Sequence, residues 1–368
     1  MGGRPRAGPV ATLAAVGVLG LPTVSRPAEN RCSLADSRIT ESSGVASASW
    51  SDDVVFTHND SGDEARIFAV DTRTCATRST FRVTGAVNVD WEDLARGAAP
   101  DGTPVLWVGD IGDNRARRPA VVVYEVGEPG PGAPGPLAIR SRWALTYPDG
   151  AHDAETILVD PETGRPVIVT KDLAGGTSVA YRLPTGGSGV LEPLARLNVR
   201  GLPGGGLANL AGAITAGATS PDRRTLVLRS YLAGWRWTAT PGEPLAATLA
   251  RPPEPLDLPV GRQAEALAFT SDGRGLWATS EGARSPLYLV PLPPAGVPGG
   301  PAVEAGRGAE PTSPDGASSP GRNPADRSWP VVAAGVGAGV ALLAGMIALL
   351  RRSHRNDPKA PLPGGRGG

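Results

Sequence analysis

Lysine and cysteine are scarce in this 368-residue sequence, and neither sign of charge predominates. Lysine occurs only at Lys171 and Lys359, so nearly all of the 36 basic residues are arginines, and they equal the 36 acidic residues in number. With a pI near 6.9, the chain has no basic excess to neutralise phosphates, which argues against nucleic acid as a partner. Glycine and proline are abundant instead, at 50 and 38 residues, so many turns and loops are expected.

Sequence signatures of several common enzyme classes are also missing. The chain has no Gly-x-Ser-x-Gly elbow, no His-Glu-x-x-His, no Walker lysine loop and no Cys-x-x-Cys. Between about residues 31 and 293 no stretch has convincing helical periodicity. Short runs of Val, Leu, Ile, Trp and Tyr alternate there with turn residues, which predicts an all-β domain.

Both ends of the sequence carry patterns typical of membrane targeting. Residues 1–29 begin with Arg4 and Arg6, continue through an apolar stretch and end in small and polar residues, which predicts a secretory signal peptide. Residues 330–350 contain an apolar run of transmembrane length, and the arginines after it predict a short basic cytoplasmic tail over 351–368. The Pro-, Gly- and Ala-rich residues 294–329 predict a disordered stalk. We therefore expect residues 30–293 to form an ectodomain outside the cell membrane, anchored by one C-terminal helix.

The two cysteines, Cys32 and Cys75, would then lie in an oxidising compartment. An even count there favours one disulfide over two free thiols. Closing a loop of this length stabilises a fold by roughly 3 to 4 kcal/mol.

The ectodomain contains five similar units of roughly 50 residues each, with four strands in most units, which predicts a β-propeller of five blades. The second strands of these units are DVVFTHND, PVLWVGD, PVIVTKD, TLVLRSY and GLWATSE. Fourth strands are predicted at STFRVTG, RSRWALTY, LARLNV and near Leu245–Leu249, and the last unit lacks one. The segment Arg31–Thr40 would supply it and close the ring. A sixth, degenerate blade at Gly127–Leu137 and a β-sandwich are the alternatives.

The repeat predicts which polar residues ring the mouth of the central channel. In an antiparallel hairpin, the residue that begins the first strand lies across from the residue that ends the second. The resulting pairs are Ser43 with His58 or Asn59, Glu92 with Asp110, Glu155 with Lys171, Thr215 with Tyr231, and Glu265 with Glu281. We interpret Glu92, Asp110, Glu155, Lys171, Tyr231, Glu265 and Glu281 as ligand-binding residues.

Two of these pairs, Glu92 with Asp110 and Glu265 with Glu281, are like-charged. Neighbouring carboxylates cannot both stay ionised unless a cation lies between them, and otherwise one takes up a proton. Two loops, DSGDE and DIGDN, add oxygen ligands of the kind that calcium prefers. The alternative is that their Asp, Asn and Gly residues only form turns. The predicted metal ligands, with calcium as the first choice, are Asn59, Asp60, Asp63, Asp110, Asp113, Glu92 and Glu265.

Three residues are candidates for catalysis: Glu155, Lys171 and His58. A histidine near the ring is a metal ligand or general base by type. His152 also falls near the ring but precedes a strand, where a solvated loop residue is the alternative.

Several motifs together resemble a group of exported actinobacterial propeller proteins. They are HNDSGD, DWEDLA, GDIGDN, the Asp153-x-Glu155 strand that ends in Val-Thr-Lys171, LRSY, and QAEALAF. These proteins are WD-repeat-like and are similar to esterase-like phytase and gluconolactonase propellers. The resemblance covers most of the ectodomain and implies a propeller with a polar central site, but no particular reaction. Glu92, Glu155 and Asn59 resemble gluconolactonase metal ligands in type, whereas the tryptophan-aspartate ending of true WD repeats is missing.

The sequence therefore predicts a membrane-anchored propeller that binds an extracellular ligand, whether protein, glycan or small molecule, or a cation at its central mouth. It would act as a recognition or scaffold module. The alternative is a divalent-metal-dependent hydrolase of a phosphoester or lactone, with the ion as Lewis acid or water activator. A third hypothesis is that the propeller is a purely structural disc for interactions. Propellers host all of these functions, so the fold does not decide among them.

Overall fold

The computed structural model describes residues 27–173, 177–197, 199, 212–260 and 263–292. Regular structure in this part of the chain is almost entirely β, as predicted. The predicted stalk (294–329), transmembrane segment (330–350) and tail (351–368), and residues 1–26 of the predicted signal peptide, lie outside the described residues. Among the residues that are described, no helix is long and apolar enough to cross a membrane.

The first two groups of strands share one nine-stranded sheet. The first group comprises β2 (Ser42–Ser47), β3 (Val54–Asn59), β4 (Arg66–Asp71) and β5 (Thr77–Thr84). The second group comprises β6 (Trp91–Ala98), β7 (Pro104–Asp110), β8 (Val121–Gly127) and β9 (Leu137–Thr146). Each is an antiparallel meander, and a short parallel pairing of the outer strands β5 and β9 joins them. The short strand β13 (Gly189–Val190) also pairs with β9.

Three four-stranded sheets make up the rest of the domain. One contains β10 (Ala154–Val159), β11 (Pro166–Thr170), β12 (Val179–Arg182) and β14 (Glu192–Arg196). The next contains β15 (Ile214–Thr219), β16 (Thr225–Ser230), β17 (Gly234–Thr238) and β18 (Glu254–Leu256). The last contains β19 (Ala266–Phe269), β20 (Gly275–Thr279), β21 (Pro286–Pro291) and β1 (Glu29–Ser33).

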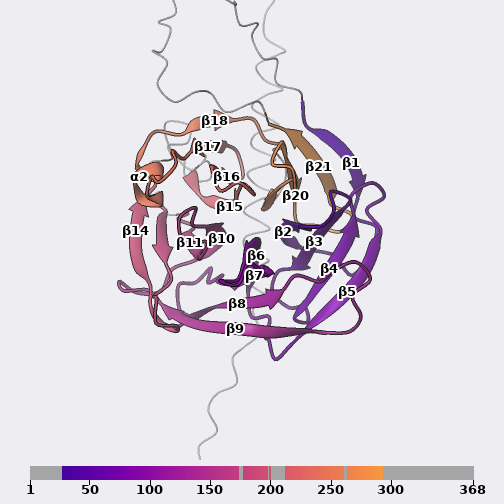
Figure 1. Cartoon of the computed structure of the whole chain (residues 1–368), viewed down its shortest axis with the longest axis horizontal. Helices are drawn as coiled ribbons and strands as arrows, with labels where there is room; N and C mark the ends of the chain where they lie inside the picture. The colour runs from indigo at the N-terminus through magenta and orange to yellow at the C-terminus, as the bar shows by residue number, and fades with distance from the viewer. Residues whose placement is uncertain (1–26, 174–176, 198, 200–211, 261–262, 293–368) are drawn as a thin grey trace, which may run out of the picture.

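The first strand of each group lies at the centre of the molecule. β2, β6, β10, β15 and β19 contact one another in this order, and β19 contacts β2, so they close a ring. The sheets radiate from this ring (Figure 1), which makes the fold a β-propeller. The strands next to the ring, such as β3 and β11, are buried along their whole length because a neighbouring sheet packs on each face. This double burial explains their continuous apolar sequence.

The N-terminal segment completes the last sheet, as the sequence predicts, although with earlier bounds. β1 pairs antiparallel with β21, with Cys32 opposite Leu287. Cys32 and Cys75 form the predicted disulfide. Since Cys75 lies between β4 and β5, the bond joins the closing strand of the last sheet to the first group of strands.

The fourth strand predicted near Leu245–Leu249 is instead a short helix, α2 (Leu245–Ala250), and β18 follows it as the outer strand. The sequence LAATLA is rich in strong helix formers. Leu245 and Leu249 are four residues apart and both buried, so one helical face packs on the sheet.

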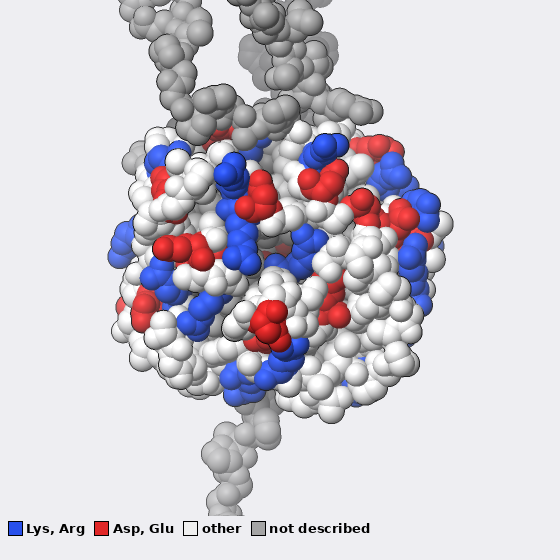
Figure 2. Space-filling view, in the orientation of Figure 1, with Lys and Arg blue, Asp and Glu red and all other residues white. Residues whose placement is uncertain are grey.

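The central channel is nearly closed at one end. Residues from the middle and far ends of all the ring strands enclose a cavity of only about 30 Å³ there, room for one or two water molecules. Its lining includes apolar side chains such as Leu94, Val159 and Phe269. The starts of the ring strands carry the polar residues, so the polar mouth lies at the other end of the channel. Basic and acidic side chains intermix around a small hollow on the face seen in Figure 2.

Candidate functional site

Four of the ring strands contain a β-bulge near their first residues, where each begins to pair with the next strand of its sheet. The register skips one residue between Ser42 and Gly44, Trp91 and Asp93, Ala154 and Thr156, and Ile214 and Ala216. The skipped residues are Ser43, Glu92, Glu155 and Thr215. A bulge re-aims the side chain that it carries. The repeat therefore places equivalent residues of successive sheets at the channel mouth, while their neighbours make the cross-strand pairs.

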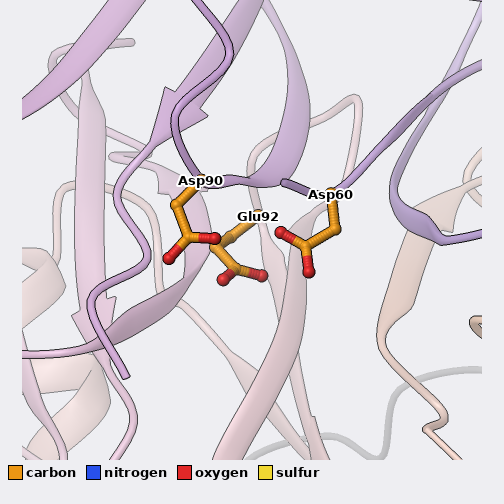
Figure 3. Close-up of side chains that lie close together, drawn as sticks. All are labelled: Asp60, Asp90 and Glu92. Atoms are coloured by element: carbon orange, nitrogen blue, oxygen red, sulfur yellow. The ribbon is translucent and has the colours of Figure 1, made fainter. Parts of the chain in front are cut away.

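Three carboxyl groups converge at this mouth, from Asp60, Asp90 and Glu92. Asp60 follows β3, Asp90 precedes β6 and Glu92 lies on β6. One oxygen from each lies within 4.8 Å of the others, and Figure 3 shows the three groups turned toward one another. We call these residues the carboxylate cluster. Asp60 and Glu92 are predicted metal ligands, and the structure brings them together with Asp90.

The surrounding backbone holds the cluster in place. The Asn88 side chain donates to the Asp60 carbonyl at 2.7 Å and accepts from the Trp91 N–H at 3.1 Å, which ties the two segments together. Ser43 Oγ lies 3.2 Å from Glu92 Oε2. Gly112 closes the other side, where a Cβ atom would stand 2.2 Å from Glu92 Oε1 and 2.5 Å from Asp90 Oδ2. Only glycine leaves room for the two carboxylates here.

Burial and mutual repulsion make full ionisation of the cluster costly. Burial raises the pKa of Asp90 to about 6, and the charge of Asp153 adds to the effect. Burial also raises the pKa of Asp60 and of Glu92 well above the usual range, and the neighbouring carboxylates raise both further. One Asp60 oxygen, Oδ1, is buried without a hydrogen-bond partner among the described residues. The group thus either retains protons or holds a cation.

Glu155 and Lys171, both catalytic and ligand-binding candidates, form the predicted pair. Lys171 Nζ donates to Glu155 Oε1, and both side chains are more than nine-tenths buried. The Lys171 ammonium also lies 5.6 Å from the centre of the Tyr231 ring. Asp153, Glu265 and Glu92 raise the pKa of Lys171 against the effect of its burial. Lys171 is therefore a fixed positive charge within an acidic site.

Glu265 and Glu281 are also close together, as the sequence predicts. Tyr231 donates its hydroxyl to Glu265 Oε1 at 3.1 Å, so this tyrosine contacts Glu265 rather than its expected partner Thr215. Thr215 donates to the Ala264 carbonyl instead. Burial raises the pKa of Glu281 well above its usual range, with the charge of Glu265 as the next cause. Glu265 Oε2 has no hydrogen-bond partner in the described part of the chain.

The other predicted metal ligands make contacts within the protein. Asp63 accepts from Arg66 at 2.6 Å and from Asn59 at 2.6 Å, and the side-chain oxygen Oδ1 of Asn59 accepts from two backbone N–H groups. Asp110 forms an ion pair with Arg118 at 2.8 Å. Asp113 accepts from the backbone N–H groups of Arg117 and Arg118 at 2.6 Å each. In the loops DSGDE and DIGDN, the second aspartates, Asp63 and Asp113, thus accept hydrogen bonds from nearby residues. Of the aspartates in these two loops, only Asp60 belongs to the cluster.

The histidines lie apart from the cluster. His58 is fully buried and packs edge-on against Trp91, with ring centres 5.5 Å apart. Burial lowers its pKa to about 4, so it is neutral at physiological pH. His152 is partly exposed and bonds to Asp149 at 2.9 Å. The residues that the sequence interpretation missed are Asp90 and Asp153, each of which directly precedes a ring strand and reads as an ordinary turn residue.

No family model matches the chain, and no curated protein matches it. Among solved structures, the chain is similar to the crystal structure of RRP9 WD40 repeats, with 15% sequence identity and a TM-score of 0.37. That similarity covers 68% of this chain and 79% of the other. It is also similar to a chain of the mitotic checkpoint complex, with 12% identity, a TM-score of 0.31, and coverage of 67% of this chain and 60% of that one. Similarities this distant carry no inference about ligands, partners or activity.

Proposed function

We propose that this chain is a five-bladed propeller that binds a divalent cation, calcium first, at its channel mouth, and that it acts as a recognition or scaffold module. The observation that carries the proposal is the carboxylate cluster of Asp60, Asp90 and Glu92. Three carboxyl groups within 4.8 Å of one another in a largely buried site need a counter-charge. Arg118 is engaged by Asp110 and Lys171 by Glu155.

The oxygen-only composition of the cluster supports calcium over softer metals. Calcium takes six to eight oxygen ligands in flexible geometry, whereas zinc prefers nitrogen and sulfur. His58, the nearest imidazole along the chain, is buried against Trp91 rather than turned to the mouth. Water and a bound ligand would complete the coordination, which leaves an open side for recognition.

Thermal unfolding of the purified full-length chain tests the proposal. Calcium at a hundredfold excess over its dissociation constant should stabilise the fold by about 2.7 kcal/mol, which chelator removes. Glu92→Gln should lose this response, and Glu64→Gln, on an exposed ion pair with Arg82, should keep it. An unfolding midpoint that no divalent ion shifts would overturn the proposal.

A second candidate function, metal-dependent hydrolysis of a phosphoester or lactone, is favoured by Lys171. A cation and the Lys171 ammonium at one mouth would both stabilise negative charge that develops on a substrate oxygen. The resemblance to esterase-like phytase and gluconolactonase propellers supports the same reading. Chelator-sensitive turnover of a phosphomonoester or lactone that Lys171→Met abolishes while the variant stays folded would establish it, and absence of turnover with intact calcium binding leaves the recognition module.

The location that we propose is the outer face of a cell membrane, with one C-terminal helix as anchor and a cytoplasmic C-terminus. The apolar run at 330–350 and the arginines after it support this topology. The Cys32–Cys75 disulfide supports an oxidising compartment. Cleavage at residues 1–29 and digestion of the ectodomain by a membrane-impermeant protease added to intact cells would distinguish it from an intracellular location.

A further inference from the structure

A second cavity, of about 310 Å³, lies between the sheet of β15–β18 and the sheet of β19–β21. Arg229 on β16 forms part of one wall, and residues at the end of β20 and the start of β21 form the other. Pro259, Val260 and Ala264 also line the cavity. The volume falls within the range of small-molecule sites.

The cavity has a cationic end at Arg229. Arg229 is only 1% exposed, and its guanidinium donates to the carbonyl oxygens of Pro259 at 2.7 Å and Ser230 at 3.5 Å. It forms no direct ion pair with any described residue. Burial lowers its pKa to about 10, although the charge of Glu265 acts on it and raises the pKa, and the group stays charged at neutral pH. A buried guanidinium without a direct ion pair is costly, and a bound anion would form that pair.

Further polar groups line the cavity, namely Arg284, Ser280 and Ser285. Arg284 is exposed and adopts a positive φ of 60°, in a tight turn that also contains Gly282. Arginine and hydroxyl groups together form a donor set that suits a carboxylate.

The cavity also has an anionic end. Glu281 lines it, and the Glu281 carboxyl lies within hydrogen-bonding reach of Glu265. Glu265 is 5% exposed, and its Oε2 has no hydrogen-bond donor among the described residues. The Gln263 side chain donates to Glu281 Oε2, and an ammonium group in the cavity would add a positive charge beside this carboxyl. A simple anion would be repelled by the two carboxylates, and phosphate, with its second negative charge, more so than a carboxylate.

Much of the remaining lining is apolar and small, with Pro259, Val260, Ala278, Ala283 and Pro286. Such a wall suits an aliphatic group of a few carbons and offers no partner for a polar side chain.

We propose that this cavity binds a small aliphatic amino acid, with its carboxylate at Arg229 and Arg284, its ammonium at Glu281, and its side chain against the apolar wall. The site is separate from the carboxylate cluster of Asp60, Asp90 and Glu92. Binding of the amino acid does not require the divalent cation.

Isothermal titration calorimetry of the full-length chain tests the proposal, with L-valine and two analogues that each lack one charged group. Isovalerate lacks the ammonium and isobutylamine lacks the carboxylate, while both keep the branched chain. L-valine should bind at least tenfold more tightly than either, with and without chelator. O-phosphoethanolamine, a zwitterion with a phosphate in place of the carboxylate, should bind more weakly than L-valine.

Two variants assign the ends of the ligand. Glu281→Gln should weaken L-valine at least tenfold and leave isovalerate unchanged or tighter, and Arg284→Gln should weaken L-valine and isovalerate alike. Arg284 is exposed, so its replacement should not disturb folding, and retention of the calcium response in Arg284→Gln checks the fold independently. The proposal would be overturned if L-valine did not bind or bound no more tightly than isovalerate and isobutylamine. It would also be overturned if neither variant changed the binding of L-valine. Tighter binding of O-phosphoethanolamine would overturn the assignment of a carboxylate.

Discussion

Glu155 and Lys171 form a buried ion pair at the mouth of the propeller channel, across the start of β10 and the end of β11. The bulge at Glu155 turns its carboxylate toward the channel, and the Lys171 N–H donates to the Asp153 carbonyl at 2.9 Å. One Glu155 oxygen, Oε2, is buried without a partner among the described residues. The pair therefore depends on one strong contact in a site from which water is largely excluded.

Lys171→Met should destabilise the fold by about 3–5 kcal/mol, because it leaves the Glu155 charge buried and unpaired. The double variant Glu155→Gln/Lys171→Met removes both charges and should recover most of that loss. Denaturant unfolding of the two single variants and the double variant gives the coupling energy. If the single and double variants lose the same amount, the lysine contributes by packing and not by charge.

Asp90→Asn should have opposite effects on the free and calcium-bound forms. Without metal, loss of one charge relieves repulsion with Asp60 and Asp153, so the unfolding midpoint should rise above that of the wild type. With calcium, the variant should lack the stabilisation of about 2.7 kcal/mol expected at a hundredfold excess. Thermal scans with and without chelator measure both effects. A variant that is destabilised equally in the two conditions would contradict the assignment of Asp90 as a ligand.

Protons should compete with the cation at the mouth. The pKa of Asp90, about 6 against a usual 3.8, is set by burial and by Asp153, Asp60, Asp110 and Arg118. The folded metal-free protein thus binds more protons than the unfolded chain between about pH 4 and 6, so its stability should fall as pH rises through this window. Calcium affinity should rise over the same window, and binding at pH 6 should release protons. Titrations in buffers of different ionisation enthalpy measure that release, and none at pH 6 would contradict the shifted pKa.

The sequence predicts the ring well because the ring depends on local patterns. The second strands at Pro104–Asp110 and Pro166–Thr170 lie where their apolar runs indicate, since both faces of each strand are buried between sheets. The disulfide follows from a count of two cysteines. The closing strand follows from a missing fourth strand in the last unit.

The composition of the cluster is not predictable in the same way. A bulge inserts one residue into a pairing of period two, and no feature of the side-chain pattern reveals it. Asp90 belongs to the connection before β6, where aspartate is an ordinary turn residue. It joins Asp60 because Asn88 bridges the two segments, a contact between residues 28 positions apart. Such contacts depend on the tertiary fold rather than on local sequence.

Loss of the disulfide should open the ring at its closing strand. The bond closes a loop with a sequence separation of 43, and its removal should cost roughly 4 kcal/mol in the chain-entropy account. Denaturant unfolding of Cys32→Ser/Cys75→Ser should show this loss, and the reduced wild type should match it. Equal stability of the oxidised and reduced proteins would mean that the pairing of β1 with β21 holds the closure unaided.

Gly112→Ala should remove calcium binding while the fold persists. The new Cβ would stand 2.2 Å from Glu92 Oε1 and 2.5 Å from Asp90 Oδ2, so both carboxylates must move out of the cluster. These atoms are the ends of side chains and can shift, whereas a clash with backbone would disrupt the sheets. The calcium-induced rise in the unfolding midpoint measures the effect. Gly130→Ala is the matched control, since its Cβ would meet nothing within 4 Å, and it should keep the full response. A full response in Gly112→Ala would show that Glu92 and Asp90 do not hold the ion.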